Sequence, residues 1–333
     1  MINPSDYLKS IQDKVKAEEE QNKLGLSNFA KAANSTEYKT ALQQTRFLRE
    51  PEAVKKGMQL LKNKEEDTTI RLLVLQKALT AIGKNSEYIR DCLSILEDPT
   101  ERLEIRKGVF TVLKVLSFGS TLFVSLRPEY MKILRSLLDE PDTNLREMAA
   151  EELAKDNDEF AQRRLLNGLT KQETPIVSDA KAIQLLAYDI HAEYYPVVRS
   201  LLQSPESDDV TKLEAIHVLG NDPESKQLLV NMMLDKKQDT ELRISTAAAV
   251  CSGHPQDFIQ IAKTLALDES ESDAMRTACL NALTLVHPTE KTALHEDQQF
   301  IEKVSRLHTL TKSPELKKIS LRYLESAARH GKQ

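Results

Sequence analysis

Glycine, tryptophan and aromatic residues are scarce in this chain of 333 residues. It contains 9 glycines and no tryptophan, and aromatic residues make up 5% of the chain. The glycine content is about 2.7%, against an average usage near 7%. Sandwiches, barrels and doubly wound α/β folds use glycine for tight turns, bulges and phosphate-binding loops. The composition therefore disfavours these fold classes and favours a helical protein.

The chain also lacks a dominant charge of one sign. Its 46 basic and 51 acidic residues give a net charge of −5. Nucleic-acid-binding domains usually have a strongly basic composition or a basic stripe. The overall charge therefore gives no support for nucleic-acid binding, although a chain with this overall charge could still contain a local basic strip.

Cysteines are few, and no pair of them has the spacing of a metal or redox motif. Cys92, Cys251 and Cys279 each lie inside an apolar helical stretch. An odd and scattered set does not form a disulfide framework, and free cysteine behaves as a small buried apolar residue. We predict three inert core thiols and a reducing compartment.

Long apolar runs are absent as well. The first 20 residues have no apolar core of the kind found in signal peptides. The most apolar run, 109–126, contains Lys114 and is too short and interrupted to span a membrane comfortably. The sequence predicts a cytoplasmic protein without a membrane span.

A repeat runs through the chain instead. Basic residues near the starts of predicted helices recur about 31 to 41 residues apart, within the size range of solenoid units. We call them marker residues; they are Lys39, Arg71, Arg106, Arg146, Lys181, Lys212, Arg243, Arg276 and Lys317. Each unit is predicted to be two antiparallel helices, of which the one with the marker residue comes first, and an acidic, proline-containing turn lies between units. Most prolines lie at helix boundaries, and stacking of such hairpins buries a continuous core. We expect small residues such as alanines 247–249 to let neighbouring helices approach closely.

The marker arginines have a predicted structural role. From the first helical turn, their side chains can reach acidic groups of the adjoining turn and so link one unit to the next. The residues concerned are Arg71, Arg106, Arg146, Arg243 and Arg276.

The segment 137–169, LLDEPDTNLREMAAEELAKDNDEFAQRRLLNGL, resembles a bacterial HEAT repeat of the phycobilisome-lyase type. The same pattern is clear again around Arg243. The resemblance implies an all-α, right-handed α-α superhelical solenoid of HEAT-like hairpins. We expect capping helices over residues 1–34 and one continuous array over residues 35–333, with about eight helix pairs and a terminal helix.

Motifs for catalysis are missing from the sequence. It contains no phosphate-binding loop and no GxSxG motif. The residues His295, Glu296 and Asp297 with His287 form the only cluster that resembles metal ligands, and their spacing fits no known pattern. Deoxyhypusine hydroxylase, a HEAT-repeat enzyme, uses several His-Glu pairs, whereas this chain has one. We therefore predict a protein that is not an enzyme and holds no metal or cofactor.

The repeat points to a protein–protein interaction scaffold or adaptor that presents an extended surface. The repeat subtype alone suggests a first alternative, a bilin lyase or chaperone-like factor for a chromophore-bearing protein. Nucleic-acid binding through a central basic strip is a second alternative.

Two candidate contact surfaces follow from the pattern. Basic residues recur in the second helices of consecutive central units and could attract an acidic segment of a partner; they are Lys132, Arg135, Arg163, Arg164 and Arg199. The alternative is a set of scattered, solvated side chains. The segment 117–126 contains Phe118, Leu122 and Phe123, and it either contacts a partner or folds onto the core.

Overall fold

The computed structural model describes residues 4–188, 193–286 and 294–330. Within these ranges every regular element is an α-helix or a short 3₁₀ helix, and none is a strand. The fold is all-α, as predicted. The residues group into two compact units, Met1–Leu153 and Ala154–Gln333, and each is described by itself. The single continuous array over residues 35–333 stays a prediction.

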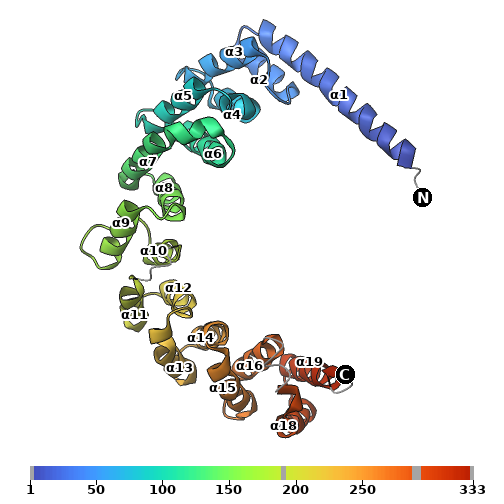
Figure 1. Cartoon of the computed structure of the whole chain (residues 1–333), viewed down its shortest axis with the longest axis vertical. Coiled ribbons are helices and arrows are strands. Elements are labelled where there is room, and N and C mark those ends of the chain that lie inside the picture. The colour runs from blue at the N-terminus through green and yellow to red at the C-terminus, as the bar shows by residue number, and fades with distance from the viewer. Residues whose placement is uncertain (1–3, 189–192, 287–293, 331–333) are drawn as a thin grey trace. The chain divides into compact units, whose positions relative to one another are not determined.

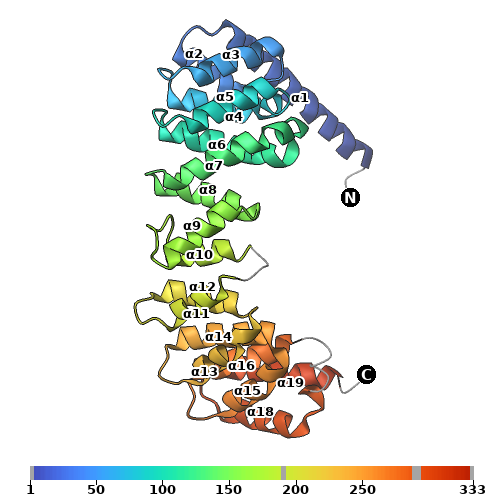
Figure 2. The same cartoon turned by 60° about the vertical axis from the view of Figure 1, so that its left-hand side comes forward.

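The first unit is a stack of helical hairpins in two layers (Figures 1 and 2). In one layer α2 packs against α4 and α4 against α6, and in the other α3 packs against α5 and α5 against α7. Its elements are α1 (Pro4–Lys31), α2 (Ser35–Gln44), α3 (Pro51–Lys62), α4 (Thr68–Ile82), α5 (Ser86–Glu97), α6 (Leu103–Gly119), η1 (Thr121–Leu126), α7 (Arg127–Ser136) and η2 (Leu137–Asp139), followed by α8 (Thr143–Lys155).

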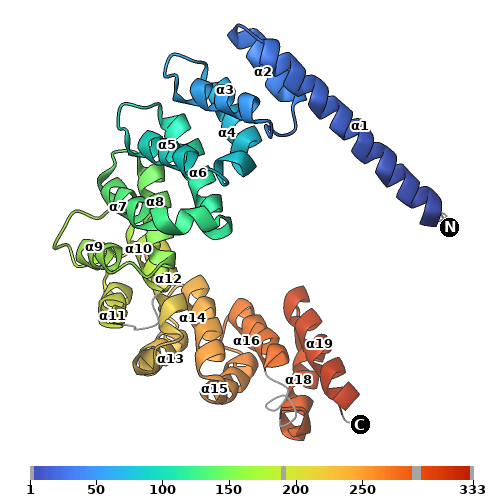
Figure 3. The same cartoon turned by 45° about the horizontal axis from the view of Figure 1, so that its top comes forward.

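The second unit repeats this arrangement. Helices α10, α12, α14, α16 and α19 pack successively in one layer, while α11, α13, α15 and α18 lie against them on the other side (Figures 1 and 3). Its elements are α9 (Glu159–Leu169), α10 (Asp179–Leu186), α11 (Tyr195–Gln203), α12 (Asp209–Leu219), η3 (Pro223–Ser225), α13 (Lys226–Leu234), α14 (Thr240–Gly253), α15 (Pro255–Leu267), α16 (Asp273–Leu285), α18 (Gln298–Leu310) and α19 (Pro314–His330).

The two kinds of helix begin differently. Marker helices, which carry a marker residue in an early turn, often start after an acidic N-cap: the Asp67 carboxylate accepts from the Thr69 amide at 2.8 Å, and Asp239 accepts from Glu241 at 2.8 Å. Such caps satisfy amides that have no helical partner. Several helices between them have proline in the first turn, where no amide hydrogen is needed; they are α3, α7, α11 and α15.

The hairpins are paired differently from the sequence-based prediction. We expected each marker helix to come first in its unit, with the acidic, proline-containing turn between units. The structure instead ties a marker helix to the helix before it, because the Nε of Arg71 donates to the Leu61 carbonyl at 2.8 Å and the Nε of Arg243 to the Met233 carbonyl at 3.0 Å. The acidic turn therefore lies inside the hairpin.

One long helix, α1, occupies Pro4–Lys31, where capping helices were expected over residues 1–34. Leu26 and Phe29 are buried against the neighbouring helices, whereas Tyr7, Ile11 and Val15 are exposed. Figure 3 shows the N-terminal part of α1 extending beyond α2 and α3. Only the C-terminal part of α1 therefore covers the end of the stack.

Membrane-spanning potential is restricted to one bent pair of segments. Among the described residues, no single helix has both the length and the apolar composition to cross a bilayer. Helix α6 and the following segment Thr121–Asp139 meet these criteria only together, and they are bent by 111° at their junction.

Candidate partner-binding site

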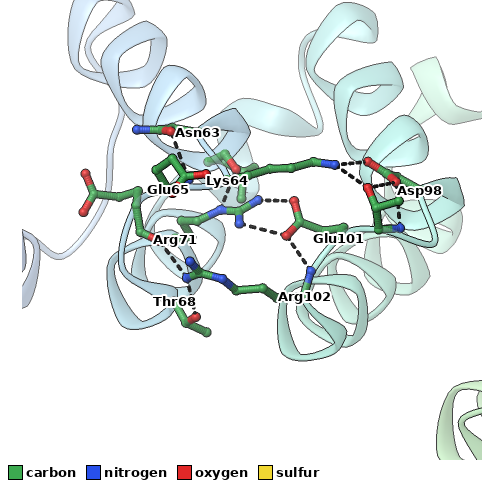
Figure 4. A network of polar contacts seen from close by, with 11 residues as sticks. Asn63, Lys64, Glu65, Thr68, Arg71, Asp98, Glu101 and Arg102 are labelled. Atoms are coloured by element: carbon green, nitrogen blue, oxygen red, sulfur yellow. Dashed lines mark hydrogen bonds and ion pairs between the residues drawn. The ribbon is translucent and has the colours of Figure 1, made fainter.

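The marker arginine Arg71 lies in a buried polar network between two hairpins of the first unit (Figure 4). Besides the Leu61 carbonyl, it binds the Glu101 carboxylate through Nη1 at 2.9 Å and Nη2 at 2.5 Å. Burial raises the pKa of Glu101, but hydrogen bonds from Arg71 and the Arg102 amide more than offset this effect. The pKa therefore lies below its usual value, and Glu101 stays ionised opposite the guanidinium.

The same network recurs in the second unit. Arg243 binds the Glu271 carboxylate through Nη1 at 2.9 Å and Nη2 at 2.6 Å. A lysine also bridges each pair of hairpins: Lys64 donates to Asp98 at 2.5 Å, and Lys236 donates to Asp268 at 2.8 Å. Recurrence of the same contacts in both units indicates that they belong to the repeat and hold hairpins together.

The remaining marker arginines also bind groups of adjoining turns. Arg106 donates to the Leu96 carbonyl at 3.0 Å and to Glu140 at 2.8 Å. Arg276 donates to the Ala266 carbonyl at 3.3 Å and to Asp273 in its own helix at 3.2 Å. Arg146 donates to the Glu140 carbonyl at 2.6 Å. None of these contacts directs a guanidinium towards an external partner.

The five residues of the predicted basic strip are divided between the units. Lys132 and Arg135 lie exposed in α7 of the first unit, and Arg163 lies exposed in α9 of the second. Arg164 is 2.9 Å from the Glu173 carboxylate, while Arg199 binds Asp222 and Glu224. The charges of Arg164 and Arg199 are thus balanced within the chain, and a continuous strip that attracts an acidic segment stays a prediction.

The predicted apolar patch is divided between core and surface. Helix α6 continues to Gly119 and is followed by η1. Phe118 is 78% exposed and Leu122 39%, whereas Phe123 is 1% exposed. The Phe123 ring packs edge-on against Tyr130, with centroids 5.2 Å apart. Phe123 is therefore a core residue and not part of a contact patch, because the 3₁₀ turn directs it inward.

A groove of about 710 Å³ crosses α10, α12 and α14 in the second unit. Short side chains dominate the part of it that α14 contributes: Ser245, Ala248 and Ser252. We expected the alanines 247–249 to allow close helix packing. Ala247 and Ala249 are buried, but Ala248 is exposed. The surface is hollow here because no side chain longer than serine projects from α14 into the groove.

Longer polar side chains border this groove. Gln184 comes from α10 and Tyr188 from the turn after it, and Glu214 and His217 come from α12. His217 is exposed, because the exposed side of α12 runs through Val210, Glu214 and His217 at helical spacing. Sequence reasoning missed the groove, although short residues two, five and nine positions after Arg243 were a usable signal.

The histidine cluster near the C-terminus is only partly described. His287 lies outside the described residues. Asp297 caps α18 by accepting from the Phe300 amide at 3.0 Å and also binds Lys263, which lowers the pKa of this carboxyl. His295 is buried beside the Tyr323 ring. Within the described part of the chain, no group of three or more histidine, cysteine or acidic side chains could hold a metal ion.

Comparison with known proteins gives a single kind of match. No protein-family model and no curated protein matches the chain. Among solved structures, it is similar to human deoxyhypusine hydroxylase in complex with glycerol. The two share 14% sequence identity over 75% of this chain and 98% of that chain, with a TM-score of 0.31.

The prediction that the chain is not an enzyme is corrected by this comparison, because the solved structure belongs to an enzyme. Missing motifs were a weak basis for that prediction. On stacked hairpins, residues that meet in space come from helices far apart in the sequence, so a site need not appear as a short motif. The likeness itself concerns the helical fold and assigns no reaction to this chain.

Proposed function

We propose that this chain is a HEAT-like scaffold that binds a segment of a protein partner in the groove across α10, α12 and α14. The observation that carries the proposal is the groove itself, which has a volume of about 710 Å³ and is lined by three successive helices. Helical repeat proteins commonly use their extended surfaces for binding. A groove formed by adjacent repeats suits a peptide segment.

The composition of the groove supports this proposal. Exposed Ala187, Ala248 and Ser252 leave room for side chains of a partner, and Tyr188 provides an aromatic surface at the edge. Aromatic residues are enriched at interfaces because they bury a large area with little loss of conformational entropy. The buried ion pair of Arg243 with Glu271 fixes α14 to the following hairpin. A groove that is formed before binding reduces the entropic cost of association.

A cytoplasmic location is part of the same proposal. Cys92, Cys251 and Cys279 are all unpaired, and two of them are buried. Unpaired cysteines are typical of proteins in reducing compartments.

Site-specific photo-crosslinking tests the proposal. A benzophenone amino acid would replace Ala248 in the groove, and in a control variant it would replace Ala328, an exposed alanine of α19. After irradiation in the source cells, we expect a defined protein adduct from position 248 and not from position 328. Equal labelling at both positions, or none at position 248, would contradict the proposed site.

A further inference from the structure

We infer that the groove across α10, α12 and α14 selects a positively charged segment that also carries apolar side chains. This inference rests on the proposed function and adds the chemical class of the partner. The inferred partner differs from the acidic partner that the basic strip predicts, because it binds to another surface, which lies on the marker helices.

The charge of the second unit supports this choice. Residues 1–153 hold 24 basic and 24 acidic side chains, so the second unit carries the whole net charge of −5. At the groove, the Glu214 side chain is part of the lining. Glu241 is exposed one helical turn before Ser245 on α14. Neither carboxylate forms an ion pair with another described residue.

The lysine and arginine side chains of the same helices contact other groups of the chain. Apart from His217, which lines the groove, the only basic residues of α12 and α14 are Lys212 and Arg243. Lys212 lines a different groove beside Asp235, and Arg243 is buried against Glu271. In α10, Lys181 donates to Gln184 at 3.0 Å. The two glutamates therefore face a surface with one nearby cation, and lysine or arginine of a partner would complement them.

The apolar part of the partner is inferred from the middle of the groove. Ala187 and Ala248 are exposed there between the polar side chains of α12, and Tyr188 is 47% exposed at the α10 edge. Apolar side chains of a partner would remove these surfaces from water. A segment with apolar residues along one line and basic residues beside it fits both features.

A random library of 16-residue peptides displayed on phage provides a suitable probe. It would be selected on the immobilised full chain and, in parallel, on Ala248→Trp, which fills the groove. Sequences that bind the natural chain but are lost with Ala248→Trp report groove binding. The same substitution at exposed Ala328 is the control and should leave the selected sequences unchanged.

Charge reversal then tests the inference. We expect groove-dependent peptides to carry net positive charge and apolar residues. The double substitution Glu214→Lys/Glu241→Lys should weaken their binding by about tenfold. The control Glu206→Lys/Glu302→Lys makes the same charge change at exposed positions outside the groove and should have little effect. Higher salt should also weaken binding.

The two proposals fail in different ways. If groove-dependent peptides are acidic or neutral, or if Glu214→Lys/Glu241→Lys binds them as tightly as the natural chain, the inference about charge is wrong while the groove remains a binding site. If no peptide depends on Ala248, both the proposed site and the inference are overturned.

Discussion

Arg71 and Glu101 form a bidentate ion pair that joins two neighbouring hairpins of the first unit. Their side chains are 0% and 2% exposed, and the closer of the two contacts is 2.5 Å long. Taking both charges out of water is costly, and only matched geometry with additional hydrogen bonds offsets that cost. Here the Leu61 carbonyl and the Arg102 amide provide these hydrogen bonds. The hairpin α3–α4 is thereby fixed to the hairpin α5–α6.

Removal of Arg71 should therefore destabilise the first unit strongly. In Arg71→Met the Glu101 carboxylate would stay buried without its partner, and we expect a loss of about 3–5 kcal/mol in the free energy of unfolding. Lys226→Met is the control, because the ion pair of Lys226 with Asp257 is largely exposed and should contribute about 0–1 kcal/mol. Urea unfolding followed by circular dichroism measures both. Equal effects of the two variants would contradict a structural role for the buried pair.

Acid should weaken the contact between Lys64 and Asp98. The hydrogen bond from Lys64 is the main cause that lowers the pKa of Asp98 from 3.8 to about 2. A lowered pKa adds stability above the unfolded-state value, and this stability is lost as the pH falls through the native value. The stability difference between the natural chain and Lys64→Met should thus be constant above pH 5 and shrink between about pH 4 and 2. A difference that does not vary with pH would refute this assignment.

Gly253 should not tolerate even a methyl group. A Cβ atom there would lie 1.8 Å from the Gly220 carbonyl oxygen, which places the ends of α12 and α14 in close contact. We expect Gly253→Ala to destabilise the second unit by about 1–3 kcal/mol through overpacking. Gly119→Ala is the control, because nothing lies within 4 Å of its Cβ position. Thermal unfolding of both variants would show whether the loss is specific to position 253.

Lys56 should hold the end of α1 in place. Its Nζ donates to the carbonyls of Phe29, Ala30 and Ala32 at 3.0, 3.0 and 2.8 Å. These carbonyls lie at or just beyond the end of α1, where a helix leaves acceptors unsatisfied. In Lys56→Met we expect faster amide hydrogen exchange in the last turns of α1, measured by mass spectrometry. Exposed Lys55→Met should leave the exchange rates as they are; similar acceleration in both would argue against the cap.

The sequence predicted the helices better than their pairing. The recurring basic residues and the prolines located most helix starts, because capping and proline chemistry are local. The pairing was wrong, since the choice between the helix before Arg71 and the helix after it depends on the hydrogen bond to Leu61. Such a contact between two helices is visible only when their side chains are placed in space.

The candidate groove was harder to predict for a similar reason. Ala248 could be read as a packing residue because it lies between Ala247 and Ala249, both of which are buried. Its exposure depends on which side of α14 faces α12 and α16. For Phe123 the sequence left two alternatives open, contact with a partner or folding onto the core, and the 3₁₀ turn buries it.

A fixed offset of ten residues separates a marker arginine from the carbonyl that its Nε binds, and it holds for Arg71, Arg106, Arg243 and Arg276. Arg146 donates to the Glu140 carbonyl, six residues before it. An insertion between the two helices of a hairpin would change this offset, whereas duplication or loss of a whole hairpin leaves each remaining arginine its carbonyl. Duplication or deletion of the gene segment for one hairpin can therefore change the length of such a protein stepwise, and no new hydrophobic core is needed.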